Sequence, residues 1–274
     1  RAFIQSKGLY GRVSVEQSDM KRLPYAENLV NLVVAEDLGA LLGKGLALKE
    51  VFRVLTPHGA LCFKGGADAG KLKATGFGEV RTSGAWTVAV KPRPAEMDDW
   101  PYFDYGPEGG SVSKDMLAGP MTSLRWRIPM YSKHCRDVVR GWVSAGGRMF
   151  YCRSVFTPDG LRQRIFLTAR DAYNGQLLWR KRVVSWMIGD RNVLATPDRL
   201  YLPLEPKGPV VALDAATGGV VQTYEGTGGC RQVMLVNGKL MITTGSDTGA
   251  FDVKSGREVW RQRGIGGPFV FAEG

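Results

Sequence analysis

The sequence predicts two folds in one chain, an α/β fold over residues 1–91 and an all-β fold of repeated four-stranded units over residues 99–274. Before residue 91, apolar runs rich in β-branched residues alternate with a stretch of helical spacing, as in mostly parallel sheets. After residue 99, short strands recur with a period of about 40 residues. Between the two parts, Pro92 and Pro94 disfavour both a helix and a central strand, so residues 92–98 are expected to form a proline-rich linker.

Strand, helix, strand and a terminal hairpin are expected in the first part. In chain order, we expect a helix end at 2–9, strands at 12–19 and 29–35, a helix at 45–55, a turn at 56–59, a strand at 60–64 and a hairpin at 77–90. Sheets of this kind bind ligands at the carboxyl ends of their strands. Asp19 follows the first predicted strand, and Glu36 and Asp37 follow the second. From these residues alone, a helix cap or a loop carboxylate explains Asp19 equally well, and a solvated loop explains Glu36 and Asp37 slightly better than a ligand site does.

Several short motifs follow one another in this part. They are Ser18-Asp19-Met20, then Leu23-Pro24-Tyr25, then the apolar run 29–34, then Glu-Val-Phe-Arg-Val-Leu-Thr-Pro-His-Gly-Ala-Leu over residues 50–61. Their content and order resemble the second half of a class I S-adenosylmethionine-dependent methyltransferase, whose fold is Rossmann-like. The resemblance covers roughly the third to seventh strands of that family.

The resemblance implies S-adenosylmethionine as a cofactor of the intact protein. Asp19 would accept a hydrogen bond from the adenine amino group, and Met20 would pack on the adenine ring. Glu36, in the segment Ala35-Glu36-Asp37, would border the methionine end of the cofactor. No catalytic residue is assigned, because proximity to the sulfonium and orientation can carry much of a methyl transfer.

Two departures from that family bear on activity. The glycine-rich first loop and the acid that holds the ribose do not occur here, and His58 stands where the family usually has Gly. In the resembled fold the third strand pairs with the second and the fourth with the first. We therefore expect that the chain begins mid-protein, and that residues 1–91 by themselves are inactive and bind no S-adenosylmethionine.

A repeated pattern determines the fold predicted for the second part. Each copy places an apolar run before Asp, then Gly four residues later, and in two copies Trp four residues after the Gly. The residues are Asp171, Gly175 and Trp179, then Asp214 and Gly218, then Asp252, Gly256 and Trp260. A period of about 40 residues with four short strands per unit is typical of a β-propeller.

The residue types of the repeat suit a tight turn between two strands. An Asp side chain can accept amide hydrogen bonds across the turn, and Gly can adopt a positive φ there. Trp179 and Trp260 then offer a large apolar area for docking against a neighbouring sheet. The roles expected for the repeated residues are therefore structural.

The motif Ala-x-Asp-Ala-x-x-Gly-x-x-x-Trp, which ends at Trp179, resembles the pyrroloquinoline-quinone-type propeller repeat. The stretch from Asp99 to Trp126 looks like the opening of such a propeller, where an early strand often closes the ring. From Trp100 to Gly274 there is material for about four units. Rings of this class have more, so further blades are expected downstream.

Three functions are compatible with these features. In the first, a propeller that binds other proteins is fused to a methyltransferase-like domain. In the second, the propeller of a quinoprotein oxidoreductase carries the quinone. In the third, the chain is a non-catalytic interaction protein of the cell envelope. We expect no pyrroloquinoline quinone, because quinoprotein alcohol dehydrogenases use adjacent cysteines. The four cysteines of this chain, none adjacent to another, are Cys62, Cys135, Cys152 and Cys230.

Charge and composition exclude some classes of partner. The net charge of +11 is spread along the chain and is not concentrated in one stripe, so no nucleic-acid partner is predicted. With no apolar run of about 18 residues, no membrane span is predicted. With two histidines no metal site is predicted, and His134-Cys135 is interpreted as part of a loop. The propeller resemblance favours the cell envelope over the cytoplasm.

Overall fold

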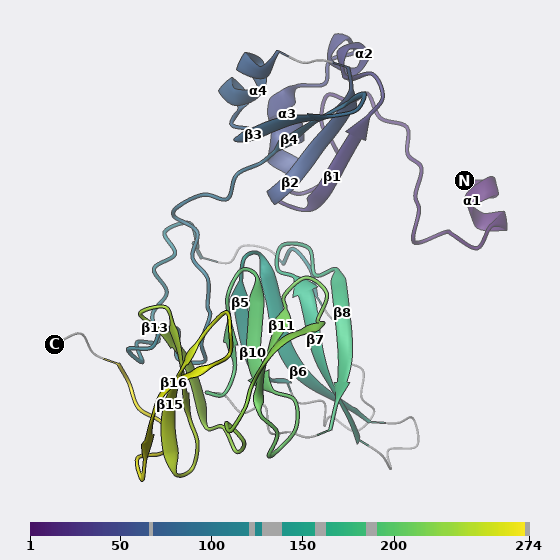
Figure 1. The fold of residues 1–274 in the computed structure, drawn as a ribbon. Helices are drawn as coiled ribbons and strands as arrows, with labels where there is room; N and C mark the ends of the chain where they lie inside the picture. Colours follow the sequence, from purple (N-terminus) through teal and green to yellow (C-terminus); the bar gives the residue numbers. More distant parts are fainter. Residues whose placement is uncertain (66–67, 121–123, 128–138, 157–162, 185–190, 272–274) are drawn as a thin grey trace. The chain divides into compact units, whose positions relative to one another are not determined.

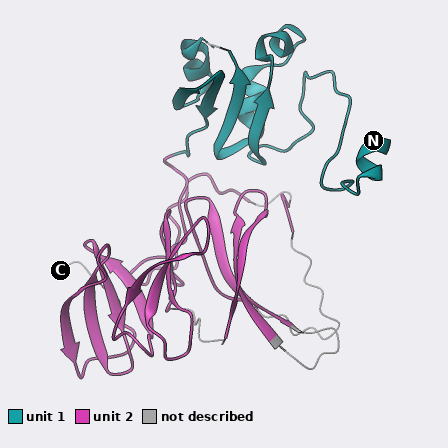
Figure 2. Cartoon of the chain, turned by 45° about the vertical axis from the view of Figure 1, so that its right-hand side comes forward, with its two compact units in different colours: residues 1–94 teal, residues 95–274 magenta. Residues whose placement is uncertain are grey.

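The computed structural model describes residues 1–65, 68–120, 124–127, 139–156, 163–184 and 191–271. The chain divides into two units, Arg1–Pro94 and Ala95–Gly274, and the boundary lies inside the proline-rich stretch (Figure 2). Because a proline supplies no amide donor and restricts the residue before it, this stretch joins the units without continuing a strand of either. Each unit is described separately.

Unit 1 is built on a four-stranded mixed sheet in the order β1-β2-β4-β3 (Figure 1). Strands β1 and β2 run parallel, and the hairpin strand β4 runs antiparallel to both β2 and β3. The strands are β1 (Val30–Ala35), β2 (Leu55–Lys64), β3 (Glu79–Ser83) and β4 (Trp86–Val90). The helices are α1 (Ala2–Ser6), α2 (Leu38–Gly43), α3 (Leu48–Val54) and α4 (Ala69–Thr75).

The core of unit 1 lies on one face of this sheet. Alternate residues of a strand point to opposite faces, so Leu61 and Phe63 of β2 point into the core while Cys62 points away. Val51 of α3 is completely buried against the same face. On the opposite face, Leu32 and Val34 of β1 remain more than half exposed.

A buried lysine ties the end of the sheet to a helix. Lys91, directly after β4, donates from Nζ to the carbonyl oxygens of Phe52 and Leu55, each at 2.8 Å. It also donates to Oδ1 of Asn28 at 2.7 Å. A lysine is rarely buried without such partners, and a cation is favourable at the carboxyl end of a helix, here α3. Lys91 therefore fixes α3, β2 and the final strand to one another.

Two local predictions for this unit are wrong. Residues 12–19 form no strand and are exposed, because no neighbouring strand pairs with their amides. The predicted turn at 56–59 lies inside β2, where the pairing with β1 skips from Leu55 to Ala60 and His58 has a φ of 64°. The turn-forming residues thus make a bulge and do not end the element.

Unit 2 contains three antiparallel sheets of four strands each within the described residues. We call them blades 1 to 3. Blade 1 has β5 (Val139–Ala145), β6 (Arg148–Phe156), β7 (Gln163–Asp171) and β8 (Leu177–Val183). Blade 2 has β9 (Leu194–Ala195), β10 (Arg199–Pro203), β11 (Val210–Asp214) and β12 (Val220–Tyr224). Blade 3 has β13 (Gln232–Val236), β14 (Lys239–Thr243), β15 (Asp247–Asp252) and β16 (Glu258–Arg263). The sequence predicts about four such units, and the described residues form three of them.

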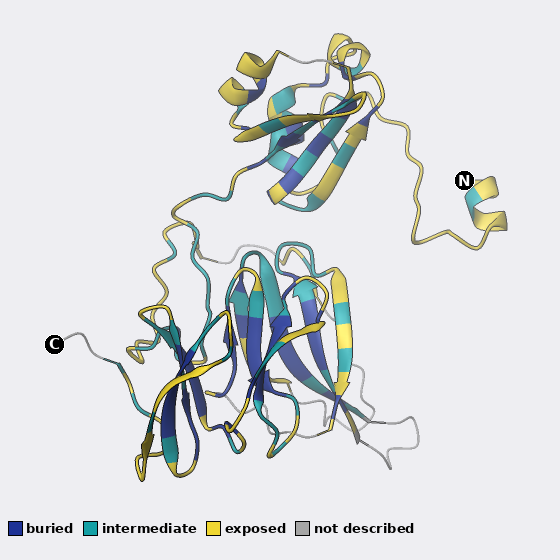
Figure 3. Cartoon of the chain, viewed as in Figure 1, coloured by how far each residue is buried: buried dark blue, intermediate teal, exposed yellow. Residues whose placement is uncertain are grey.

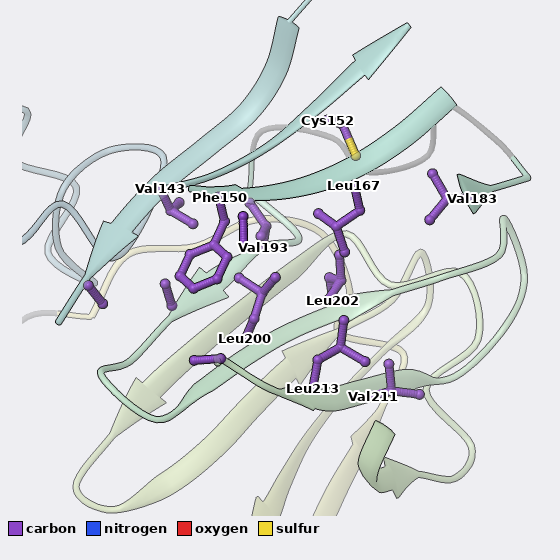
Figure 4. Packing of buried hydrophobic residues seen from close by; sticks show 14 of the residues in the cluster. Val143, Phe150, Cys152, Leu167, Val183, Val193, Leu200, Leu202, Val211 and Leu213 are labelled. Carbon is purple, nitrogen blue, oxygen red and sulfur yellow. The ribbon is translucent and has the colours of Figure 1, made fainter. Parts of the chain in front are cut away.

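Apolar side chains fill the space between successive blades. Between blades 1 and 2, Phe150 points toward Leu200 and Leu167 points toward Leu202, as Figure 4 shows. A second cluster, which includes Tyr224, joins blades 2 and 3. Figure 3 shows the burial concentrated in the middle strands, whereas β8 and β16 are largely exposed. Face-to-face stacking of sheets is the packing expected of propeller blades.

The turn between the third and fourth strand has the same geometry in all three blades. In blade 2, Oδ1 of Asp214 accepts from the amides of Ala216 and Thr217, and the amide of Gly218 donates to the Asp214 carbonyl at 2.8 Å. The equivalent carboxylates in the other blades are those of Asp171 and Asp252. The turn glycines Gly175, Gly218 and Gly256 have φ values of 73°, 72° and 70°.

A tryptophan from the preceding segment docks on two of these turns. Nε1 of Trp179, in β8, donates to the carbonyl of Ala215 in blade 2 at 3.0 Å. Its ring lies so close to Gly218 that a Cβ there would be 2.8 Å from it. Trp126 makes the same bond to Ala172 of blade 1, at 3.1 Å, and covers Gly175.

The predicted opening stretch from Asp99 to Trp126 does not form a blade strand in its described residues. Instead, three consecutive residues each contact the first strand of a different blade. Trp100 forms an antiparallel bridge with Ser144 of β5, the Pro101 carbonyl accepts from Ala195 of β9, and the Tyr102 hydroxyl bonds both backbone groups of Leu235 in β13. This segment therefore crosses all three blades.

Asp98 holds that segment in place. Its Oδ2 accepts from the Tyr105 hydroxyl and, at 2.8 Å, from the amide of Lys114. Burial opposes ionisation of the carboxyl, but the hydrogen bonds from Tyr105 and from the backbone outweigh it, so the pKa of Asp98 lies below its ordinary value.

The turn geometry predicts opposite outcomes for two adjacent glycines. Gly218→Ala should destabilise the fold by about 2–4 kcal/mol, because alanine resists a positive φ and its Cβ meets the Trp179 ring. Gly219→Ala should change stability by less than about 1 kcal/mol, because the nearest atom to its Cβ is 3.5 Å away. Urea unfolding of both variants measures the difference. Equal midpoints would contradict the assigned turn.

Candidate functional site

A cleft of unit 1 lies at the carboxyl ends of β1 and β2. Its volume is about 570 Å³, within the range of about 300–1,000 Å³ usual for small-molecule sites. The chain leaves β1 at Glu36 and Asp37 and leaves β2 at Lys64, so these residues lie on its rim. Leu38, Leu42, Leu48, Phe63 and Leu72 supply its apolar lining.

The acidic groups of this cleft already have partners. Oε1 of Glu36 pairs with Nζ of Lys64 at 2.7 Å, and this hydrogen bond together with the lysine charge lowers the pKa of Glu36. Asp37 caps α2 by accepting from Ala40 at 2.8 Å. Asp68 caps α4 in the same way. The carboxylates therefore shape the cleft, and within its described lining none is buried in the manner of a catalytic acid.

The structure does not place all predicted cofactor residues together. Glu36 lies in the cleft, but Asp19 and Met20 are not part of its lining. Oδ1 of Asp19 accepts from the amide of Lys21 at 3.1 Å within a loop. Met20 has a φ of 64° and packs against the core of unit 1. The expectation that Asp19 ends a strand is wrong, because residues 12–19 form no strand.

The sequence reasoning missed two residues of this cleft. Lys64 is the last residue of the strand predicted at 60–64, and the carboxyl end of such a strand is where ligands bind. Asp68 precedes α4, which was not predicted. The helix has few apolar residues, but an Asp directly before a run of helix formers is an N-cap signal.

In unit 2, exposed apolar side chains recur where the outermost strand of each blade begins. Each of these six residues exposes between 40% and 52% of its surface. They are Leu177 and Leu178 in β8, Val220 and Val221 in β12, and Val259 and Trp260 in β16. We call them the outer-strand residues. Each lies on an edge strand, whose outward backbone groups can pair with another chain.

The described residues contain no group of three or more side chains suited to a metal ion. In the same part of the chain, no helix has the length and apolar character needed to cross a membrane. His134 and Cys135 lie outside the described residues.

Comparison with protein families identifies the repeats. Residues 162–272, less than half of the chain, match a family described as the outer membrane protein assembly factor BamB. This match, together with the three four-stranded sheets, supports the prediction of propeller repeats, and this stretch is similar to the repeats of that family. The match does not extend to residues 1–94, so the methyltransferase resemblance has no support from it. No curated protein matches the chain.

Several solved structures are also similar. BamB from Moraxella catarrhalis is 21% identical, with a TM-score of 0.35 over 46% of this chain and 38% of its own. A quinohemoprotein alcohol dehydrogenase from Pseudomonas putida HK5 is 17% identical, with a TM-score of 0.38 over 60% of this chain and 26% of its own. The enzyme of the same name from Comamonas testosteroni is also 17% identical, with a TM-score of 0.38 over 72% and 29%. This chain thus spans less than two fifths of each.

Proposed function

We propose that unit 2 is a scaffold that binds other proteins, in the cell envelope. The observation that carries this proposal is the series of outer-strand residues. Monomeric proteins seldom expose apolar side chains at corresponding positions of successive edge strands, because such edges invite pairing with other chains. The BamB-like character of the repeats supports the same role, since that family is described as an assembly factor.

The geometry suits recognition through strand edges. Among the residues that the structure describes, the outermost strands β8, β12 and β16 each pair with one neighbouring strand. A partner segment could extend any of these sheets by backbone hydrogen bonds, while its side chains contact the outer-strand residues. Three edges in one unit give a partner several points of attachment, which raises its overall affinity beyond that of a single edge.

Photocrosslinking in the cells that produce the protein tests this proposal. A photoreactive amino acid at Leu178, Val221 or Val259 is expected to capture the same partner from each position. The same amino acid at Asn237, which is exposed in the β13–β14 turn, serves as the control. A partner captured no better from the three outer-strand positions than from Asn237 would contradict the proposal.

We further propose that unit 1 is part of an S-adenosylmethionine-dependent methyltransferase-like domain that binds the cofactor in the intact protein. Two observations support this: the parallel pair β1 and β2 is followed by a reversed hairpin strand, and a cleft opens at the carboxyl ends of that pair. In the resembled fold, the exposed edge of β1 is paired with a strand of the first half. Glu36 would then border the methionine end of the cofactor.

Calorimetric titration with S-adenosylmethionine tests this second proposal. We expect no binding to residues 1–274, because Asp19 lies in a loop and outside the cleft. We expect binding to the product of the complete reading frame, weakened by Glu36→Gln and unaffected by Glu79→Gln, a matched exposed acid on β3. Micromolar binding to the 274-residue chain, or none to the complete product, would contradict the proposal.

A further inference from the structure

The interface between blades 2 and 3 lacks the tryptophan that the interface between blades 1 and 2 has. In the sheet registers, Trp179 pairs with Ala169 in blade 1, and Gln222 occupies the corresponding place opposite Ala212 in blade 2. Trp260 returns at this place in blade 3, opposite Ala250. Gln222 is therefore a local departure from the repeat. At the interface between blades 1 and 2, the same place is filled by the indole ring of Trp179.

The polar groups of the blade 3 turn are satisfied without an indole. The carbonyl of Val253, which corresponds to the Ala215 carbonyl bound by Trp179, accepts from the Tyr224 hydroxyl at 2.8 Å. The Gln222 amide lies over Gly256 and donates to the Thr223 carbonyl of its own strand at 2.8 Å. Two smaller contacts thus replace the bond and the cover that the tryptophan gives in the previous interface.

The Gln222 side chain covers Gly256 but fills only part of the place of an indole ring. A cleft of about 610 Å³ lies at this position, within the range of about 300–1,000 Å³ usual for ligand sites. Its apolar lining consists of Tyr201, Ala212, Val221, Leu235 and Val253. Tyr201 corresponds in the repeat to Phe150, whose ring lies 6.0 Å from that of Trp179. The cleft therefore keeps the aromatic wall against which an indole packs one blade earlier.

The charges at the rim do not favour a small ion. Arg199 is engaged by two carboxylates, Asp214 at 3.5 Å and Asp198 at 3.7 Å. Lys254 and Asp198 lie at the same rim with opposite charge. A neutral aromatic group satisfies this cleft better than a charged one, because the rim has no strong net charge while the lining is apolar.

We propose that this cleft binds an aromatic side chain, tryptophan fitting best, from an extended segment of a partner protein. The segment lies along β12, an edge strand, and turns its aromatic ring into the place that Trp179 fills in the preceding interface. The inference rests on the proposed function of unit 2 as a scaffold, and it adds the chemistry of the segment that is bound.

Methyl NMR of the whole chain with N-acetyltryptophanamide as the probe tests the inference. The probe should bind with a dissociation constant of about 1–10 mM. Its ring should shift the methyl signals of Val221, Leu235 and Val253, whereas those of Leu177, on the edge strand of blade 1, should not move. N-acetylleucinamide is the matched probe without a ring and should bind at least about tenfold more weakly. Equal binding of the two probes, or shifts outside the cleft only, would overturn the inference.

Two substitutions of Gln222 distinguish a loss of probe binding caused by filling the cleft from a loss caused by disruption of the fold. Gln222→Trp should fill the cleft from within, weaken probe binding at least about tenfold and leave the thermal midpoint unchanged or raised. Gln222→Ala should leave the cleft open and retain binding. Undiminished binding to a folded Gln222→Trp variant would overturn the inference. If that variant does not fold, the methyl shifts of the unsubstituted chain decide.

Probe binding and photocrosslinking together distinguish this inference from the proposed function. Crosslinks from Leu178 and Val259 do not involve the cleft. If those crosslinks persist while the probe fails to bind, only the aromatic site is wrong. If the crosslinks are absent and the probe binds as described, the cleft recognises aromatic groups and the scaffold function is wrong.

Discussion

An indole ring seated on the glycine turn of the next blade is the contact that fixes how blades 1 and 2 are arranged. Apolar burial between two sheets is not directional, so by itself it leaves their relative rotation poorly fixed. The bond from Trp179 to the Ala215 carbonyl removes that freedom, and it is possible only because Gly218 has no Cβ. The positive φ of the turn and the close approach of the ring therefore both require glycine at position 218.

The same constraint explains where unit 2 can carry function. At the turns of blades 1 and 2, the rings of Trp126 and Trp179 lie directly over Gly175 and Gly218. At the third turn, Gln222 and Tyr224 share the two tasks of the indole, and the space that it would occupy opens beside an edge strand. A structural repeat thus acquires a candidate binding site by losing one of its structural side chains, without any added loop.

Much of this could be predicted from the sequence, and the failures have physical reasons. The turns at Asp171, Asp214 and Asp252 followed from spacing, because the turn chemistry is local. The strand predicted at 12–19 does not form. Alternation of apolar and polar residues indicates two faces of a strand, but it does not supply a neighbouring strand to pair with. Helices α2 and α4 were missed because they are short, with only Asp37 and Asp68 marking their starts. The sequence shows that the second repeat has Gln222 where the other two have tryptophan. The cleft, however, also depends on the positions of Tyr201 and Tyr224, and the spacing of residues in the sequence does not predict those positions.

A double-mutant cycle between Trp179 and Gly218 tests the central claim most directly. If the ring is what forbids a Cβ at Gly218, the destabilisation by Gly218→Ala should fall by at least about 1 kcal/mol when Trp179 is alanine. Trp179→Ala and Gly256→Ala form the matched cycle, because Gly256 is covered by Gln222. Those two changes should be additive within about 0.5 kcal/mol. If Gly218→Ala destabilises the Trp179→Ala variant as much as it destabilises the unsubstituted chain, the arrangement of blades 1 and 2 does not depend on this contact.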